Sequence, residues 1–408
     1  MALEPFSLLV LFAITIVVGY IGSLVFEKTH IPDIIWLMLF GLLVSSLNLV
    51  DRNVFVVISP FLSAIAILII LFDAGLNMDF YQMVRGVPRG MFLALIGAVV
   101  DTLVVTAVGV LVIGMNLLHA LLLGIILVGT SSAIVLSVAS RLRAREKIKM
   151  TLELESIFTD PLVIVVAIVL LNIMVQPGAQ LSTVSVAGSS VMSAFSIGAV
   201  VGMITGLIWL FALDKLKGKP FDYMLSLAIL LLVYVFVEAV GGSGAIGALF
   251  FGLVLGNGAA FSRMLKFEKQ FTIDHLFKRF QNEVSFFIRS FFFVYLGLIV
   301  SIQAQYVLYG IVITFVIAVS RFVVVKLGTA GLQLPASEKR VMSIMIPRGL
   351  APAVLAQLPV VYGIEGADIY TNVIFVVILA SVLYTTVAIK FVDGRKHEIA
   401  PHVPKKDK

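Results

Sequence analysis

Residues 151–171 read TLELESIFTDPLVIVVAIVLL, an apolar segment whose first half includes the acidic residues Glu155 and Asp160. As a helix, a segment of this length crosses the roughly 30 Å hydrocarbon core of a bilayer. Comparable apolar runs recur along the 408-residue chain, which is 61% hydrophobic and only 13% charged, with a mean hydropathy of +1.13. Soluble globular proteins carry about 25% charged residues, so the composition predicts an all-α membrane protein.

The apolar runs predict about thirteen transmembrane helices. They lie near residues 6–26, 33–50, 54–77, 90–113, 117–140, 151–174, 184–213, 222–240, 245–257, 284–302, 306–327, 340–362 and 370–392. All but four of the 29 Lys and Arg fall in the odd-numbered connections and the C-terminal tail. By the positive-inside rule, this asymmetry predicts a multi-pass protein of the cell membrane with its N-terminus outside and its C-terminus in the cytoplasm. The basic residues therefore indicate topology, and no nucleic-acid partner is expected.

Two of the predicted helices are interrupted. Residues 117–140 contain the small polar string Gly129-Thr130-Ser131-Ser132, and residues 340–362 contain Pro347-Arg348-Gly349. Taken alone, a Ser/Thr cluster in a membrane helix is more often helix–helix packing than a ligand set. Interruptions at matching positions of two halves, however, indicate an inverted-repeat transporter with its site at the repeat interface.

Asp160 is the centre of the candidate site. A charged side chain at mid-membrane depth costs at least ~2.5–3.5 kcal/mol, so it requires a function or a partner. Ser156 lies four residues earlier and shares a helix face with Asp160. Pro161 cannot donate a backbone hydrogen bond, which frees the carbonyl of Ile157 beside the carboxylate. Together these oxygens predict a cage for a small hard cation.

The other charges in predicted helices are interpreted as structural or gating groups. Glu155 and Thr159 share the face next to that of Asp160, so we expect Glu155 to form an ion pair with Arg348 near the site. Structural pairing or gating is favoured for most of the remaining charges, which are Asp73, Asp101, Glu238, Arg289 and Arg321. Because Cys is absent, disulfides and thiolate metal sites are excluded.

An ordered set of motifs along nearly the whole chain resembles the sodium/proton antiporters of the cation/proton antiporter superfamily. Residues 155–161 (ESIFTDP) resemble the family signature E-S-x-x-N-D-P, and Thr130-Ser131 precede Asp160 at the interval of the family's Thr-Asp-Pro motif. Further matches are Ile31-Pro32-Asp33 with Gly41, residues 71–76 (LFDAGL), Glu238 with Gly242-Ser243-Gly244, residues 251–257 (FGLVLGN) and Pro347-Arg348-Gly349. Each motif is weak alone, whereas their order is specific.

The resemblance implies a homodimer with crossed, discontinuous fifth and twelfth helices and an elevator-like movement. Within a membrane transporter domain of residues 1–392, it places the core bundle at about 90–174 and 306–392. It places the dimerisation and scaffold helices at about 6–77 and 184–302. Residues 393–408 are expected to form a short basic cytoplasmic tail.

For the site, the resemblance implies that Asp160 binds both the cation and the proton, with the Ser156 hydroxyl and the Thr130 backbone oxygen as further metal ligands. Ser131 and Thr159 complete the predicted ion- and proton-binding set. Both depart from the family pattern, since Ser131 stands where the family carries Asp and Thr159 where it carries Asn. The string from Thr130 (TSSAIV) is closer to the potassium-efflux branch. The cation therefore stays open, with Na⁺ preferred, K⁺ next and Li⁺ not distinguished.

The predicted function is secondary active exchange of a monovalent cation for H⁺, in which the two compete for Asp160. With Glu155 committed to Arg348, one titrating acid remains, which predicts one-for-one, electroneutral exchange. No cofactor and no enzymatic activity are expected. The expected partners are the cation, the proton, membrane lipid and a second copy of the chain, and the implied role is pH homeostasis.

Two alternatives stay open at this point. A monovalent cation channel would need a continuous pore with a filter, yet no Gly-Tyr-Gly string is present. An intramembrane enzyme would need an aspartyl pair, for which Asp73 and Asp160 are the candidates, but the chain lacks a Gly-x-Gly-Asp string.

Overall fold

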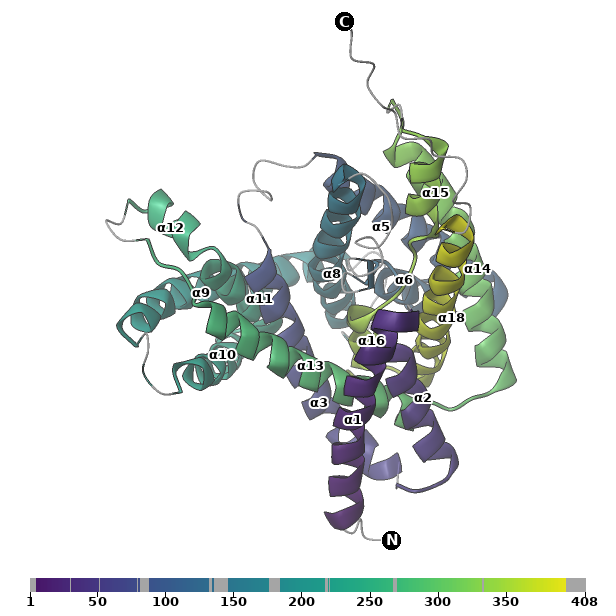
Figure 1. Ribbon diagram of the computed structural model, residues 1–408, viewed down its shortest axis with the longest axis horizontal. Coiled ribbons are helices and arrows are strands. Elements are labelled where there is room, and N and C mark those ends of the chain that lie inside the picture. The colour runs from purple at the N-terminus through teal and green to yellow at the C-terminus, as the bar shows by residue number, and fades with distance from the viewer. Residues whose placement is uncertain are drawn as a thin grey trace, which may run out of the picture.

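The structure is a computed structural model. It describes residues 5–29, 31–50, 52–78, 80, 88–131, 134–135, 146–175, 184–216, 219, 221–266, 270–331 and 334–393. Across these ranges the secondary structure is helical, with no strand, which confirms the predicted all-α class. Figure 1 shows the helices with the start of α1 and the end of α18 at opposite ends of the molecule.

The helices follow the predicted segments closely. In chain order they are α1 (Pro5–Thr29), α2 (Asp33–Ser46), α3 (Arg52–Asn77), α5 (Pro88–Val108) with the π-helical turn η1 (Gly109–Ile113), α6 (Leu117–Ile126), α8 (Glu146–Met174), α9 (Val184–Leu216), α10 (Asp222–Ala239), α11 (Gly244–Gly256), α12 (Gly258–Met264), α13 (His275–Ile299), α14 (Ala304–Gly328), α15 (Ala336–Ile344), α16 (Leu350–Leu355), α17 (Leu358–Val361) and α18 (Asp368–Asp393).

The described residues contain eight helices long and apolar enough to cross a membrane, or nine if α11 and α12, which meet at a bend of 80°, form one span. Four shorter apolar helices, at 33–46, 117–126, 223–239 and 350–361, accompany them. The chain is therefore a multi-pass membrane protein, and the count of thirteen spans stays a prediction.

The helices pack in two groups that Figure 1 separates clearly. In one group α11 packs against α3, α9 and α10; in the other α5 and α14 pack against α6, α8, α15 and α18. The long helix α13 crosses α2 where both lack a side chain, because a Cβ on Gly41 would collide with the carbonyl of Val294 and one on Gly297 with that of Met38. Such contacts between small residues let membrane helices approach closely and hold them together by packing.

Both predicted interruptions are present, and they touch each other. After α6 the chain turns at Gly129, whose φ of +83° suits glycine, and continues without helix through Ser131. Between α15 and α16, residues 345–349 are likewise not helical. The Ser131 N–H donates to the Pro347 carbonyl at 2.7 Å, and a Cβ on Gly349 would lie 2.5 Å from the Ser131 hydroxyl oxygen. The two broken segments therefore cross in direct contact.

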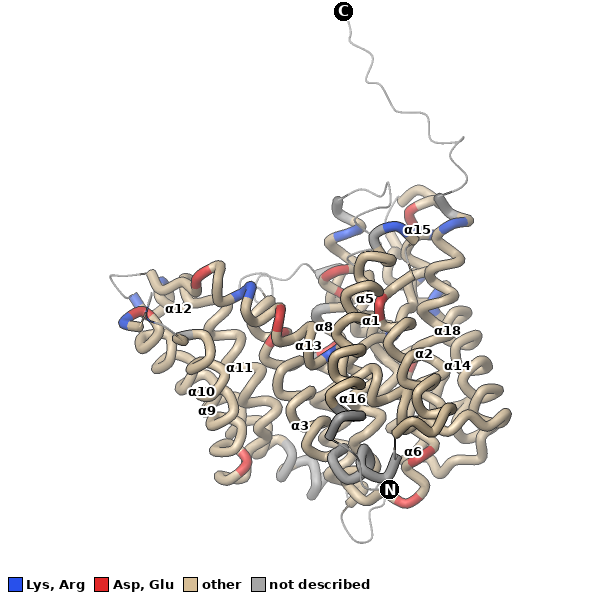
Figure 2. Tube along the Cα trace, turned by 60° about the horizontal axis from the view of Figure 1, so that its bottom comes forward, with Lys and Arg blue, Asp and Glu red and all other residues tan. Residues whose placement is uncertain are grey.

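The charges are distributed unevenly between the two ends of the bundle. Figure 2 shows Lys and Arg gathered at the end where α12 and α15 lie, whereas Asp and Glu occur at both ends. The same figure shows a few basic residues deep inside the bundle. Several basic positions of the predicted topology, including residues 141–145 and the tail from 394, lie outside the described residues.

Candidate functional site

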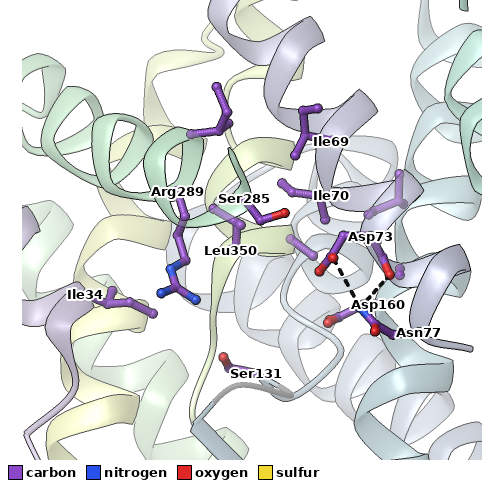
Figure 3. Close-up of a pocket in the computed structure, with 14 residues that line it drawn as sticks. Ile34, Ile69, Ile70, Asp73, Asn77, Ser131, Asp160, Ser285, Arg289 and Leu350 are labelled. Carbon is purple, nitrogen blue, oxygen red and sulfur yellow. Dashed lines mark hydrogen bonds between the residues drawn. The ribbon is translucent and has the colours of Figure 1, made fainter. Parts of the chain in front are cut away.

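A cavity of about 170 Å³ lies beside the crossing of the two broken segments. Four elements supply its polar lining: Asp73 and Asn77 come from α3, Ser131 from the break after α6, Asp160 from α8, and Ser285 and Arg289 from α13. Figure 3 shows Arg289 on the opposite side of the cavity from Asp73 and Asp160. The rest of the lining is apolar, with Ile34, Ile69, Ile70, Ala74, Ile164, Ile288, Leu350 and Ala351. The cavity thus spans the two helix groups and holds two carboxylates and one guanidinium.

Asp160 faces this cavity in a partly buried position. It lies directly beside the first break, because a Cβ on Gly129 would be 3.5 Å from its carboxylate oxygen Oδ1. Among the described residues, no hydrogen bond or ion pair joins this carboxylate to another side chain. An acid in a mostly apolar membrane cavity without a fixed partner can bind a proton or a cation from solution.

The other predicted ligands form a hydrogen-bonded chain behind Asp160. The Ser156 hydroxyl donates to the Thr130 carbonyl, and the Thr159 hydroxyl donates to the Ser156 carbonyl at 3.1 Å. All three residues are buried. The structure therefore brings the predicted set together at the break, with Asp160 and Ser131 lining the cavity and the other three one layer behind them. Their role as ion ligands stays a prediction.

The predicted ion pair of Glu155 with Arg348 is wrong. Glu155 lies on the side of α8 that faces α14 and receives both ends of the Arg321 guanidinium, with Nη2 to Oε2 at 2.8 Å. Arg321 also donates from Nε to the Met342 carbonyl at 3.1 Å. Both side chains are almost fully buried, with exposures of 5% for Arg321 and 4% for Glu155.

Arg348 forms a second buried pair, with Asp101 of α5. Its Nη2 lies 2.7 Å from Asp101 Oδ2, and its Nη1 donates to the Gly129 carbonyl at the first break. The Ser320 hydroxyl donates to the other Asp101 oxygen at 2.9 Å, and the Arg348 N–H donates to the Ser381 hydroxyl at 3.0 Å. Arg348 lies within the crossing, where its positive charge stabilises the Gly129 carbonyl at the end of the broken helix. Its guanidinium is bonded there and to Asp101, and not to Glu155.

The remaining intramembrane charges have individual partners. Arg289 donates to Asp33 at 3.2 Å, and the Glu238 carboxylate accepts the N–H of Gly244 at 2.7 Å, at the start of α11. Asp73 accepts a hydrogen bond from the amide of Asn77 at 3.1 Å. Structural pairing, the interpretation favoured from the sequence, therefore holds for Asp101, Glu238 and Arg321, whereas Asp73 and Arg289 line the cavity.

Sequence reasoning did not single out Asn77 or Ser285. A signal for both was present, since Asp73 with Asn77 and Ser285 with Arg289 are each four residues apart in otherwise apolar segments. Residues at this spacing share one helix face, so two polar pairs of this kind indicate a wet cavity beside both helices. In the described lining of the cavity, the possible ligand atoms are side-chain oxygens and no sulfur, which favours a small hard cation over a soft one.

Comparisons with known proteins indicate the family of this chain. The sequence profile described as sodium/hydrogen exchanger, transmembrane, matches residues 12–392. A probable Na⁺/H⁺ antiporter 2 from Methanocaldococcus jannaschii is 26% identical over 356 residues, which cover 83% of this chain and 81% of that protein. The K⁺/H⁺ antiporter NhaP from Alkalimonas amylolytica is 27% identical over 329 residues, 79% of this chain but 55% of that protein, so this chain spans about half the length of such relatives.

The fold is also similar to a solved structure. The sodium proton antiporter MjNhaP1 from Methanocaldococcus jannaschii at pH 8 matches with a TM-score of 0.79 at 23% identity, over 94% of this chain and 100% of that chain. At this identity the similarity concerns the helical architecture alone.

Proposed function

Because this chain belongs to the sodium/hydrogen exchanger family, and so is a cation/proton antiporter and not an enzyme, we propose that it exchanges a monovalent cation for H⁺ at the cavity beside Asp160. One observation carries the proposal. Asp160 faces the cavity without a basic partner among the described residues, whereas the two other acids near the crossing, Glu155 and Asp101, each hold an arginine.

In the proposed mechanism a proton and a cation compete for one carboxylate. Deprotonated Asp160 binds the cation together with the Ser131 hydroxyl, and protonation releases it. Ser156 and Thr130 stay candidate ligands although they bond to each other, because a hydroxyl and a carbonyl oxygen each keep a lone pair after forming one hydrogen bond. Thr159, three residues after Ser156, donates its hydroxyl to the Ser156 carbonyl and extends this chain of hydrogen bonds.

We propose one-for-one, electroneutral exchange. The observed ion pairs support this stoichiometry, because Glu155 is neutralised by Arg321 and Asp101 by Arg348. Asp73, the other acid in the cavity, accepts a hydrogen bond from the Asn77 amide at 3.1 Å. One titrating acid, Asp160, then carries either one H⁺ or one cation.

We propose an elevator-type movement between the two helix groups. The group of α5, α6, α8, α14, α15, α16 and α18 would carry the site, and the group of α1, α2, α3, α9, α10, α11, α12 and α13 would serve as scaffold. The position of the cavity supports this division, because its lining comes from both groups. We further propose that the chain forms a homodimer through the scaffold group.

Na⁺ is the proposed cation, with K⁺ as the second candidate. The relatives carry both names, and Ser131 and Thr159 replace the Asp and Asn of the sodium/proton signature. We further propose that the protein lies in the cell membrane with the α12 and α15 end facing the cytoplasm. The Lys and Arg at that end support this orientation by the positive-inside rule. The role in the cell would be pH homeostasis.

The test is exchange in proteoliposomes that contain a pH-sensitive dye, with Na⁺, K⁺ and Li⁺ supplied in turn. We expect Asp160→Asn to lower the exchange rate by at least about 100-fold, because the amide cannot ionise. A loss of this size corresponds to roughly 2.7 kcal/mol. Glu283→Gln, an exposed acid on α13, is the matched control and should exchange normally. Full activity of Asp160→Asn would contradict the site, and rates that change with imposed voltage would contradict electroneutrality.

The channel alternative is tested in the same preparation. A channel would give currents far above the turnover of a transporter and would need no proton gradient. Such currents in the reconstituted protein would replace the exchange mechanism.

A further inference from the structure

Arg289 places a permanent positive charge in the cavity that would receive a cation. Its side chain comes from α13, is 28% exposed, and lines the same cavity as Asp160 and Asp73. Figure 3 shows the guanidinium on the far side of the cavity from the two acids. Arginine stays protonated at any physiological pH, so this charge repels an entering cation wherever no carboxylate offsets it.

A single ion pair holds this guanidinium at its side of the cavity. Arg289 Nη2 lies 3.2 Å from Asp33 Oδ2, on the first residue of α2. The Arg289 Nε is buried without a hydrogen-bond partner, and the ring of Phe286 lies 5.8 Å from the guanidinium carbon. Within the described part of the chain, Asp33 is thus the one side chain that fixes the direction of Arg289 by a hydrogen bond.

Asp33 is well placed for this task. Its other oxygen, Oδ1, accepts the N–H of Ile34 at 3.1 Å, so both carboxylate oxygens are engaged. The helix that carries it, α2, is locked to α13 at the contact of Gly41 with Gly297. The pair therefore joins two helices of fixed relative position, and its geometry does not depend on the broken segments.

We propose that Asp33 is a positioning residue that restrains Arg289 and thereby sets the affinity of the cavity for its cation. The inference rests on the proposed function, because it takes the cavity beside Asp160 as the cation site. When Asp33 is present, Arg289 stays away from the acids. When Asp33 is lost, the freed guanidinium turns toward Asp73 and Asp160 and occupies the place of the cation.

The test measures the KM for Na⁺ and for K⁺ in proteoliposomes at fixed pH. Asp33→Asn keeps an oxygen for the Ile34 N–H but loses the charge, and we expect KM to rise about fivefold with Vmax nearly unchanged. Arg289→Gln removes the repelling charge and should lower KM about threefold. Arg289→Lys keeps the charge and should raise KM above that of Arg289→Gln. The exposed pair on the same helix gives the controls, Arg279→Gln and Glu283→Gln, which should leave KM unchanged.

The double variant Asp33→Asn with Arg289→Gln decides between direct and indirect action. If Asp33 acts through Arg289, its replacement has no further effect once Arg289 is neutral. An equal rise in KM in both backgrounds would show that Asp33 acts by its own charge and would overturn the proposal. Asp160→Asn separates the two levels: if it is inactive while Asp33→Asn and Arg289→Gln keep the normal KM, only this inference fails, and if it exchanges normally, the proposed function fails.

Discussion

Replacing Arg321 by Gln should destabilise the protein strongly. The guanidinium meets both carboxylate oxygens of Glu155, and the two side chains are 5% and 4% exposed. Removing one partner of such a buried pair leaves an uncompensated charge and costs about 3–5 kcal/mol. The exposed pair of Arg279 with Glu283, at 72% and 67% exposure, gives the matched control. Such surface pairs contribute about 0–1 kcal/mol.

The assay is thermal unfolding in detergent, followed by tryptophan fluorescence. The chain has two tryptophans, Trp36 and Trp209, and no cysteine, so intrinsic fluorescence is the natural probe. From the difference between the two pairs, Arg321→Gln should lower the apparent Tm by about 5 °C or more, and Arg279→Gln by less than about 1 °C. Equal shifts for the two variants would show that the buried pair does not stabilise the fold.

A double-mutant cycle identifies the partner of Glu155. Glu155→Gln combined with Arg321→Gln removes both charges, so the double variant should be more stable than the sum of the single effects by about 2 kcal/mol. Glu155→Gln combined with Arg348→Gln should be close to additive, because Arg348 pairs with Asp101. The stronger coupling appearing between Glu155 and Arg348 would refute the pairing described above.

Two further variants test the crossing and the scaffold. Gly349→Ala places a Cβ 2.5 Å from the Ser131 hydroxyl oxygen, so it should lower the exchange rate in proteoliposomes at least about tenfold. This corresponds to an increase of roughly 1.4 kcal/mol in the barrier. The control is Gly97→Ala, whose Cβ has no neighbour closer than 3.6 Å and which should exchange normally. Asn257→Ala removes the bonds that tie α11 to the Met78 carbonyl, at 2.7 Å, and to the Phe80 N–H, at 2.9 Å. It should lower the apparent Tm by about 2–4 °C without changing the KM for the cation, and a changed KM would contradict its purely structural role.

The two breaks could be predicted from the sequence because their cause is local. Gly129 permits the positive φ at the first break, and Pro347 and Gly349 lie within the second. The long apolar helices were predictable for the same reason, since hydropathy depends on neighbouring residues alone. Where a helix extends into polar sequence, hydropathy misses that part of it. The helix α13, for example, begins at His275 and not near residue 284.

The pairing of the buried charges could not be predicted in this way. Glu155, Arg321, Asp101 and Arg348 come from four separate elements, and either arginine could satisfy either acid by charge alone. The crossing determines the pairing, because it places Arg348 against the Gly129 carbonyl. Glu155 faces α14 instead and pairs with Arg321 of that helix. Spacing within one helix carries no information about such contacts between helices.

The two buried pairs have a consequence for coupling if the site moves as proposed. Glu155 with Arg321 and Asp101 with Arg348 lie within the group that would move, and each pair is neutral. The charge of that site then depends on Asp160, which is neutral with H⁺ or a monovalent cation and negative when empty. Moving an unpaired charge through the membrane costs at least ~2.5–3.5 kcal/mol, or a factor of roughly 100 in rate. The empty site is therefore held back while either loaded form crosses, which makes exchange obligatory and uncoupled leak slow.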